Sequence, residues 1–251
     1  MTSQNIPAHT FVLVHGGFHG GWCWREVARG LRARGHEVYT PTQTGLGERS
    51  HLLTKDITLD TFIEDITQVL RFEDLHDVIL VGHSFGGNSV SGVADRMPER
   101  IKLLVYLDAV ILQNGQTMFD GLPPEVVAAR LKAAEASGGV SAALPPATMF
   151  NLIEKAHIEF AEAHLTPHPM GTYLSKLNLK HPVTNGCDAV YVHCTEPAFA
   201  SLQSSRDWVK THGAALGMRM VEIKTGHDAM ISAPRLLTDL LCELSGDHGF
   251  K

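Results

Sequence analysis

The sequence lacks the features that are typical of secreted proteins, membrane proteins and nucleic-acid-binding proteins. Only four of its 251 residues are cysteines, and no two of them form a Cys-x-x-Cys pair, so we expect reduced, buried thiols. Positive charge is also scarce. With 21 Lys and Arg against 27 Asp and Glu, the net charge is −6, and no basic block interrupts the chain. We therefore expect no nucleic-acid partner and no membrane partner.

Long apolar runs and a targeting segment are missing as well. No stretch approaches the roughly 20 apolar residues that a helix needs to cross a bilayer. The first nine residues show neither the charged part nor the apolar part of a signal peptide, so the expected location is the cytoplasm. The remaining composition, 44% hydrophobic and 19% charged, is ordinary for a globular protein, and the length suffices for one large domain.

Short apolar runs alternate with helical patterns along most of the chain. The run at residues 10–14 is continuously apolar, as expected for a strand that is buried on both faces. The runs lie at residues 10–14, 37–40, 78–81, 101–107, 189–193 and 218–223. This order predicts an α/β fold with a mostly parallel sheet that is flanked by helices.

The alternation stops between residues 113 and 186. This stretch contains paired and single prolines and two helical patterns, at 126–136 and 149–163, but no long apolar strand. We interpret it as a helical cap over the carboxyl ends of the strands, with residues 1–112 and 187–251 forming the core. A linker is the alternative, but apolar residues such as Met149, Phe150 and Phe160 would then lack burial.

The most informative motif is Gly-His-Ser-Phe-Gly at residues 82–86, directly after the apolar run 78–81. A nucleophile on a sharp strand-to-helix turn needs small residues two positions before and two after it, because the backbone crowds itself there. The motif therefore predicts that Ser84 is a catalytic nucleophile. A glycine-rich turn that happens to hold a serine is the alternative, and the strand before it and the helical pattern after it argue against that.

A serine hydroxyl needs a base to take its proton, and the base needs a third group to orient it. In this architecture the chain order is Ser, acid, His. His227 follows the apolar run 218–223 and precedes the last helical segment, 234–244, and it alone of the fifteen histidines has this place. We predict that His227 is the base. A surface-loop histidine is the alternative.

Acyl transfer also needs hydrogen-bond donors for the oxyanion of the tetrahedral intermediate. One expected donor is the backbone N–H of Phe85, the residue after the nucleophile. The second should come from the loop after the first strand, so we assign it to the N–H of Gly17 or of its neighbour Phe18. A plain strand-to-helix turn is the alternative at this loop.

Together these motifs resemble one branch of the α/β-hydrolase fold. The stretches that carry the resemblance are Phe-Val-Leu-Val-His-Gly-Gly-x-His-Gly-Gly-Trp-x-Trp, Gly-His-Ser-Phe-Gly-Gly, Leu-Asp-Ala, Val-x-Cys-Thr-Glu and Thr-Gly-His. The branch contains plant methyl-ester hydrolases, hydroxynitrile lyases and small bacterial carboxylesterases, some of which cleave pyrethroid esters. The resemblance spans residues 10–244 and is weakest in the cap. It implies a small helical cap inserted after the sixth strand of the family's fold, no metal, no organic cofactor and often a homodimer.

Two chemistries compete within that branch. The lyase members carry a threonine at the position of Gly16 and a lysine directly after the catalytic histidine, where this chain has Asp228. A lysine stabilises a departing cyanide, whereas an aspartate does not. The resemblance therefore implies a serine carboxylesterase. A lyase and a non-catalytic ligand receptor on the same fold remain as alternatives.

The acid of the triad is less clearly marked. The plant enzymes place an aspartate directly after the Cys-Thr-Glu stretch, where this chain has Pro197, so we prefer Glu196, one residue earlier. Asp108, directly after the run 101–107, is the alternative acid, and Asp207 comes third. Glu196 would otherwise be a solvated loop carboxylate.

The apolar residues of the cap favour a bulky hydrophobic ester, of the pyrethroid, aryl or alkyl kind, so the expected partner is a small-molecule hydrophobic ester. Three cap histidines, at 157, 164 and 168, lack the spacing of a zinc site, so we expect surface or pocket histidines and no metal. The candidate substrate-binding residues are Gly16, Phe18, His19, Met118, Phe119, Met149 and Phe150.

Overall fold

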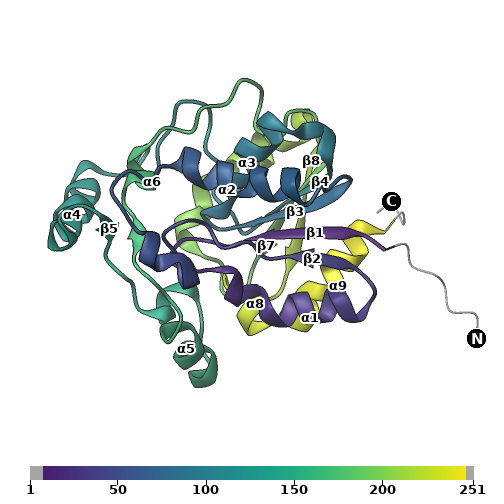
Figure 1. Ribbon diagram of the computed structural model, residues 1–251, viewed down its shortest axis with the longest axis horizontal. Coiled ribbons are helices and arrows are strands. Elements are labelled where there is room, and N and C mark those ends of the chain that lie inside the picture. The colour runs from purple at the N-terminus through teal and green to yellow at the C-terminus, as the bar shows by residue number, and fades with distance from the viewer. Residues whose placement is uncertain (1–7, 247–251) are drawn as a thin grey trace, which may run out of the picture.

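A computed structural model describes residues 8–246, so most of the stretch in which no signal peptide was expected lies outside the described residues (Figure 1). Six strands form one sheet in the order β2-β1-β3-β4-β7-β8, and every neighbouring pair is parallel. The strands are β1 (Thr10–Val14), β2 (Glu37–Tyr39), β3 (Val78–His83), β4 (Ile101–Leu107), β7 (Ala189–Cys194) and β8 (Met218–Ile223). The predicted fold class is confirmed.

Helices cover both faces of this sheet (Figure 1). One face carries α2 (Leu59–Phe72), α3 (Gly86–Arg96) and α7 (Gln203–His212), and the other carries α1 (Arg25–Ala33), α8 (Ala229–Ser232) and α9 (Pro234–Ser245). Short 3₁₀ turns link these elements at Gly21–Trp24, Gly47–Leu52, Pro98–Arg100, Ala200–Leu202 and Gly213–Leu216. No helix within residues 8–246 is long and apolar enough to cross a membrane.

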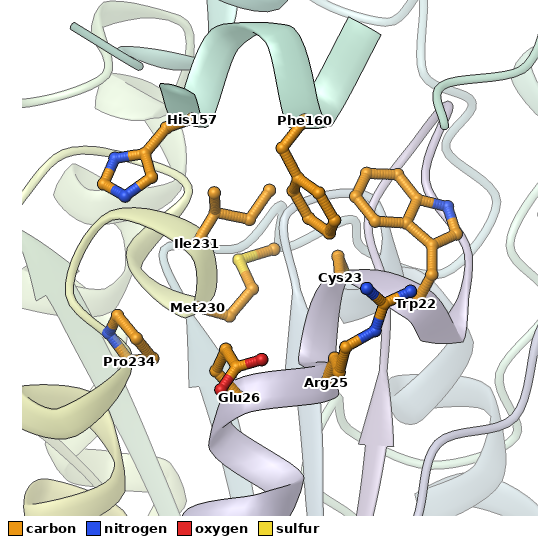
Figure 2. A pocket seen from close by; sticks show the side chains of 9 residues that line it. All are labelled: Trp22, Cys23, Arg25, Glu26, His157, Phe160, Met230, Ile231 and Pro234. Carbon is orange, nitrogen blue, oxygen red and sulfur yellow. The ribbon is translucent and has the colours of Figure 1, made fainter. Parts of the chain in front are cut away.

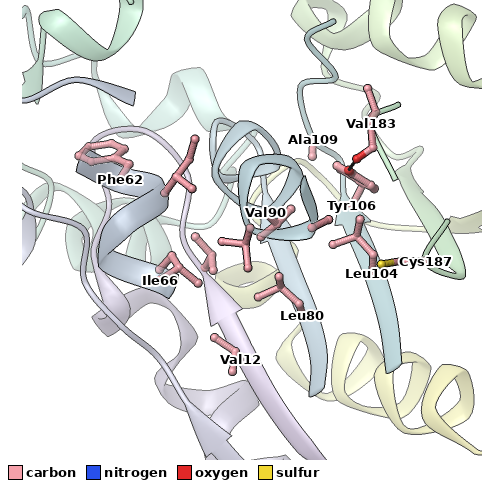
Figure 3. Packing of buried hydrophobic residues seen from close by; sticks show 14 of the residues in the cluster. Val12, Phe62, Ile66, Leu80, Val90, Leu104, Tyr106, Ala109, Val183 and Cys187 are labelled. Atoms are coloured by element: carbon pink, nitrogen blue, oxygen red, sulfur yellow. Dashed lines mark hydrogen bonds between the residues drawn. The ribbon is translucent and has the colours of Figure 1, made fainter. Parts of the chain in front are cut away.

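The inner strands β1, β3, β4 and β7 are largely apolar because successive side chains enter two different cores. Leu80 and Leu104 pack against the α2–α3 side, as Figure 3 shows, while Ile79 and Val105 pack against the α1–α9 side. Burying such a side chain fully stabilises the fold by about 1.5–3 kcal/mol. The two cores hold the strands rigidly, and the strands in turn hold the loops at their carboxyl ends.

The segment 113–186 lies at the end of the sheet to which the strands point, on the left of Figure 1. It contains α4 (Pro124–Ala134), α5 (Lys155–Glu162), α6 (Gly171–Leu174), the strands β5 (Ser141–Ala142) and β6 (His168–Pro169), and 3₁₀ turns at Glu135–Ser137 and Ala147–Phe150. The single helix expected over 149–163 was wrong. Asn151 adopts a φ of +61° and ends the first turn, so α5 starts separately at Lys155.

Candidate active site

Ser84 sits on a tight turn between the end of β3 and the start of α3. Its φ is +52°, in the left-handed region that non-glycine residues rarely adopt. A Cβ added to Gly82 would lie 2.8 Å from the carbonyl oxygen of Gly86, and one added to Gly86 would lie 2.6 Å from the carbonyl oxygen of His15. The turn therefore requires both glycines, which is the crowding that the motif predicts.

A continuous chain of hydrogen bonds leads away from the serine. The Ser84 hydroxyl donates to Nε2 of His227 at 3.0 Å, and Nδ1–H of His227 donates to Oδ2 of Asp108 at 2.7 Å. The histidine and the aspartate are both fully buried. Asp108 comes directly after β4, the sheet neighbour of β3, and its own N–H donates to the carbonyl of Val192. This is the nucleophile–base–carboxylate geometry of a catalytic triad.

The contact expected between Glu196 and His227 does not form. After β7 the chain stays beside the loop that follows β8, because the N–H groups of Thr195 and Glu196 donate to the carbonyls of Ile223 and Thr225. This pairing turns the Glu196 side chain outward, where it is 62% exposed and 4.0 Å from Nζ of Lys224. Asp207 is exposed on α7 and accepts a hydrogen bond from Gln203 instead.

Two residues that no motif marked complete the surroundings of His227. The Phe199 ring is stacked on the imidazole, with 4.1 Å between ring centroids and 19° between planes. Arg206, only 2% exposed, donates from Nη1 to the carbonyl of Phe199 and places the same atom 3.7 Å from Oδ1 of Asp108. A buried arginine on α7 thus joins the loop over the imidazole to the carboxylate beneath it.

Two backbone N–H groups next to Ser84 are available to a ligand. Within residues 8–246 no protein acceptor binds the N–H of Gly17 or the N–H of Phe85. The N–H of Phe18, the other expected donor, is taken by Nδ1 of His168 at 3.2 Å. The sequence left Gly17 and Phe18 as alternative donors in the loop after the first strand, and the geometry therefore favours Gly17.

His19 supports this loop rather than lining a pocket, which corrects its expected place among the substrate-binding residues. Its ring is 1% exposed and lies between the carbonyl of Gly17, 2.7 Å from Nδ1, and Oδ2 of Asp228, 3.0 Å from Nε2. Burial lowers the pKa of His19, but the Asp228 carboxylate and the Gly17 carbonyl together outweigh burial, so the pKa is raised. A protonated His19 donates from both nitrogens and ties the Gly17 loop to the His227 loop.

The neighbouring histidines are held neutral. Burial lowers the pKa of His15 to about 3 and that of His83 well below its ordinary value. His83, His227 and Asp228 bring ligand atoms within 4.8 Å of one another, as a metal site would. Nε2–H of His83 donates to the carbonyl of His227, however, and the other two side chains already bind Ser84, Asp108 and His19. We assign no metal to this group.

Aromatic side chains surround the serine on the cap side. Phe18 and Phe150 lie 6.4 Å apart, and Phe150 lies 6.5 Å from His227. Tyr173, which no motif marked, lies 5.4 Å from Phe85 and 6.0 Å from Phe119.

Of the two methionines that we expected to bind the substrate, one is partly buried against the core and the other lies at the surface. Met118 accepts a hydrogen bond from the buried Asn88 through its sulfur at 3.2 Å, whereas Met149 is 54% exposed and joins none of these contacts.

A cavity of about 390 Å³ lies apart from the serine, between α5, α1 and α8 (Figure 2). None of its lining residues is an expected site residue; they are Trp22, Cys23, Arg25, Glu26, His157, Phe160, Met230, Ile231 and Pro234. Trp22 stacks on His19 at 5.3 Å, so the cavity lies behind the His19–Asp228 pair. It has no direct contact with the hydrogen-bond chain of Ser84.

The sequence model of the alpha/beta hydrolase family matches residues 11–240. The chain belongs to this family. It is 36% identical over 250 residues to the carbendazim hydrolyzing esterase of Nocardioides sp., covering 93% of this chain and 98% of that one. It is 27% identical over 262 residues to methylesterase 2 of Arabidopsis thaliana, covering 98% of each. A solved extracellular alpha/beta-hydrolase from a Paenibacillus species is 28% identical, with a TM-score of 0.78, and 95% of this chain and 99% of that chain are covered.

The resemblance to the esterase branch of this fold is confirmed by these relatives. Carboxylic ester hydrolysis is the activity that they support for the chain.

Gly16 offers a first test of how tightly the site is packed. A Cβ at this position would lie 2.8 Å from Cβ of Ser84 and 2.9 Å from Nδ1 of His83, closer than side chains pack. We expect Gly16→Ala to lower kcat about 10²-fold, because a displacement of about 1 Å at the nucleophile has that order of effect. The control is Gly246→Ala, whose Cβ would have 3.7 Å of room. Wild-type kcat in Gly16→Ala would show that the turn has room for a side chain.

The His19–Asp228 pair predicts a pH dependence of stability. Because the pKa of His19 is raised above 6.5 in the folded state, the pair stabilises the fold fully below about pH 6.5. This contribution is lost as the pH rises through the raised pKa. We expect urea titrations between pH 6.5 and 9 to show a falling free energy of unfolding in the wild type, and a flatter profile in Asp228→Asn. The exposed Asp207→Asn should keep the wild-type slope. Equal slopes in the wild type and Asp228→Asn would contradict the assignment.

Proposed function

We propose that the protein hydrolyses small hydrophobic carboxylic esters through an acyl-enzyme on Ser84. The hydrogen-bond chain from Ser84 through His227 to Asp108 carries this proposal, because it supplies a nucleophile, a base and an orienting carboxylate in one line. The free N–H groups of Gly17 and Phe85 supply the oxyanion donors that acyl transfer requires.

Each step of the reaction has an atom to perform it. Ser84 attacks the ester carbonyl while its proton passes to Nε2 of His227. The N–H groups of Gly17 and Phe85 hold the oxyanion, and His227 then gives the proton to the leaving alcohol. Water then attacks the acyl carbon while Nε2 of His227 takes its proton, and the proton passes to Oγ of Ser84 as the bond to the released acid breaks.

The neighbours of His227 favour its charged form during the reaction. Asp108 fixes the proton on Nδ1, so that Nε2 faces the serine, and stabilises the imidazolium once it forms. The Phe199 ring, stacked 4.1 Å away, presents an aromatic face to that cation.

Five aromatic rings on the cap side of the serine favour a substrate with an apolar acyl or alcohol group. They belong to Phe18, Phe85, Phe119, Phe150 and Tyr173. A panel of p-nitrophenyl esters of increasing acyl length tests this, together with methyl, aryl and pyrethroid esters and carbendazim. We expect kcat/KM to rise with apolar size from the acetate upward, measured against Ser84→Ala as the background. A panel in which no ester is hydrolysed faster than by Ser84→Ala would contradict the proposal.

A cytoplasmic location and a homodimer stay predictions from the sequence.

Hydroxynitrile cleavage is the rival chemistry, and Asp228 argues against it. Its buried carboxylate binds His19 and lies next to His227, so it would repel a departing cyanide instead of stabilising it. We expect no cyanide from mandelonitrile above the rate without enzyme, using protein that has been shown to turn over an ester. Enantioselective release of cyanide would show that the choice between the two chemistries was wrong.

A further inference from the structure

The cap grips the loop that carries the oxyanion donor. Phe18 adopts a φ of +66°, a strained conformation for a residue with a bulky side chain, and persists there only if its surroundings hold it. Its N–H donates to Nδ1 of His168 at 3.2 Å, and its carbonyl accepts the N–H of Thr166 at 3.0 Å. Both backbone polar groups of Phe18 are thus bound by cap residues that lie two positions apart in sequence.

The proton on His168 has a defined place. The Thr172 hydroxyl donates to the carbonyl of Pro169 at 2.8 Å, so its oxygen accepts Nε2–H of His168, also at 2.8 Å. Burial, with smaller effects of His15 and His19, lowers the pKa of His168 well below its ordinary value. The ring is therefore neutral, and Nδ1 keeps the lone pair that Phe18 N–H needs.

The ring is also fixed in position. His168 is fully buried and packs against Phe85 at 4.7 Å, Tyr173 at 5.0 Å and Phe62 at 5.5 Å. An ideal Cβ on Gly17 would lie 3.5 Å from Nδ1, so the imidazole lies directly beside the oxyanion loop. From the core side the same loop is held by His19, which binds the Gly17 carbonyl.

We propose that His168 is a positioning residue for the oxyanion hole: its Nδ1 holds Phe18 in the left-handed conformation and thereby aims the N–H of Gly17 at the reacting carbonyl. The catalytic part of this inference rests on the proposed ester hydrolysis. It gives the cap a second role beside covering the substrate, because the cap supplies the group that shapes the loop.

Three substitutions at one position separate this role from simple packing. The side-chain oxygen of asparagine replaces Nδ1 of histidine, that of glutamine replaces Nε2, and leucine has no acceptor. We expect His168→Leu and His168→Gln to lower kcat about 10²-fold, the order seen when an oxyanion donor is lost, with KM within about threefold of wild type. His168→Asn should stay within about fivefold of wild-type kcat. His164→Leu, a cap histidine that contacts Trp22 and Phe160, is the matched control and should keep wild-type kcat.

Hydrogen exchange at the Phe18 amide reads the same contact without substrate. We expect slow exchange in the wild type and in His168→Asn, and faster exchange in His168→Gln. Equal exchange and equal kcat in the Asn and Gln variants would overturn the proposal, even if His168→Leu fails to fold. If the wild type hydrolyses no ester, the proposed function fails, while the exchange data still decide whether His168 positions Phe18.

Discussion

Ser84→Ala should lower kcat for ester hydrolysis about 10⁶-fold, the order of loss when a triad nucleophile is removed. The substitution deletes only Oγ, so the strained turn between β3 and α3 keeps the same Cβ and the same neighbours. Folding should be unaffected, because the hydroxyl binds only His227 Nε2 within the described residues. Steady-state hydrolysis of the best ester of the panel, with circular dichroism and a thermal melt, measures both effects.

The control for this loss is Ser91→Ala on α3, the helix that follows the Ser84 turn. Ser91 is a buried serine whose hydroxyl donates to the Gly87 carbonyl and lies beside the Tyr106 hydroxyl, away from His227. We expect kcat within a few-fold of wild type for this variant. If Ser84→Ala kept even a tenth of the wild-type kcat, Ser84 would not be the nucleophile.

Asp108→Asn is expected to lower kcat about 10⁴-fold, as the corresponding change does in a serine protease. An asparagine amide can donate to Nδ1 of His227, which leaves the proton on Nε2 and the histidine unable to accept from Ser84. Glu196→Gln should leave kcat within about twofold, because the carboxylate is exposed and faces Lys224. Both variants are assayed with the same ester at equal concentrations of folded enzyme.

Folding must be checked separately for the Asp108 variant, because Arg206 would keep its buried charge without the nearby carboxylate. Asp207→Asn, an exposed carboxylate on the same helix as Arg206, serves as the control and should match the wild type. An inactive Glu196→Gln beside an active Asp108→Asn would contradict the hydrogen-bond chain described here.

The sheet could be predicted because its signal is local. A strand buried on both faces is a largely apolar run, as in β1, β3, β4 and β7, and the expected strand positions match the six strands. The tight turn at Ser84 could be predicted for the same reason, since Gly82, Ser84 and Gly86 crowd it. Asn151 shows where local patterns fail: a helical spacing continues across it, but its left-handed backbone breaks the segment in two.

The acid could not be settled from the sequence, because it depends on where two distant loops turn. Asp108 and Glu196 both follow strands that neighbour each other in the sheet, so both lie at its carboxyl end. Only the hydrogen bonds from Thr195 and Glu196 to the loop after β8 decide that Glu196 turns outward. That Asp108 directly follows the strand beside the nucleophile was the available signal, and it made this residue the alternative.

His168 and Arg206 were beyond the reach of motifs for another reason. Each contacts a residue that is distant in the sequence. His168 lies 150 residues from Phe18, and Arg206 reaches Asp108, which follows β4, from α7. Histidine and arginine side chains suggest positions at the surface, and only the structure shows that these two are buried against specific partners.

Labelling with a fluorophosphonate, followed by mass spectrometry of the modified peptide, tests the central claim most directly. The reagent forms a covalent bond with a serine that has been activated by its neighbours. We predict one label per chain, on Ser84, with none on Ser84→Ala and strongly slowed labelling of Asp108→Asn. A wild-type protein that stays unlabelled, as a non-catalytic receptor of this fold would, or that carries the label on another residue, would contradict the account.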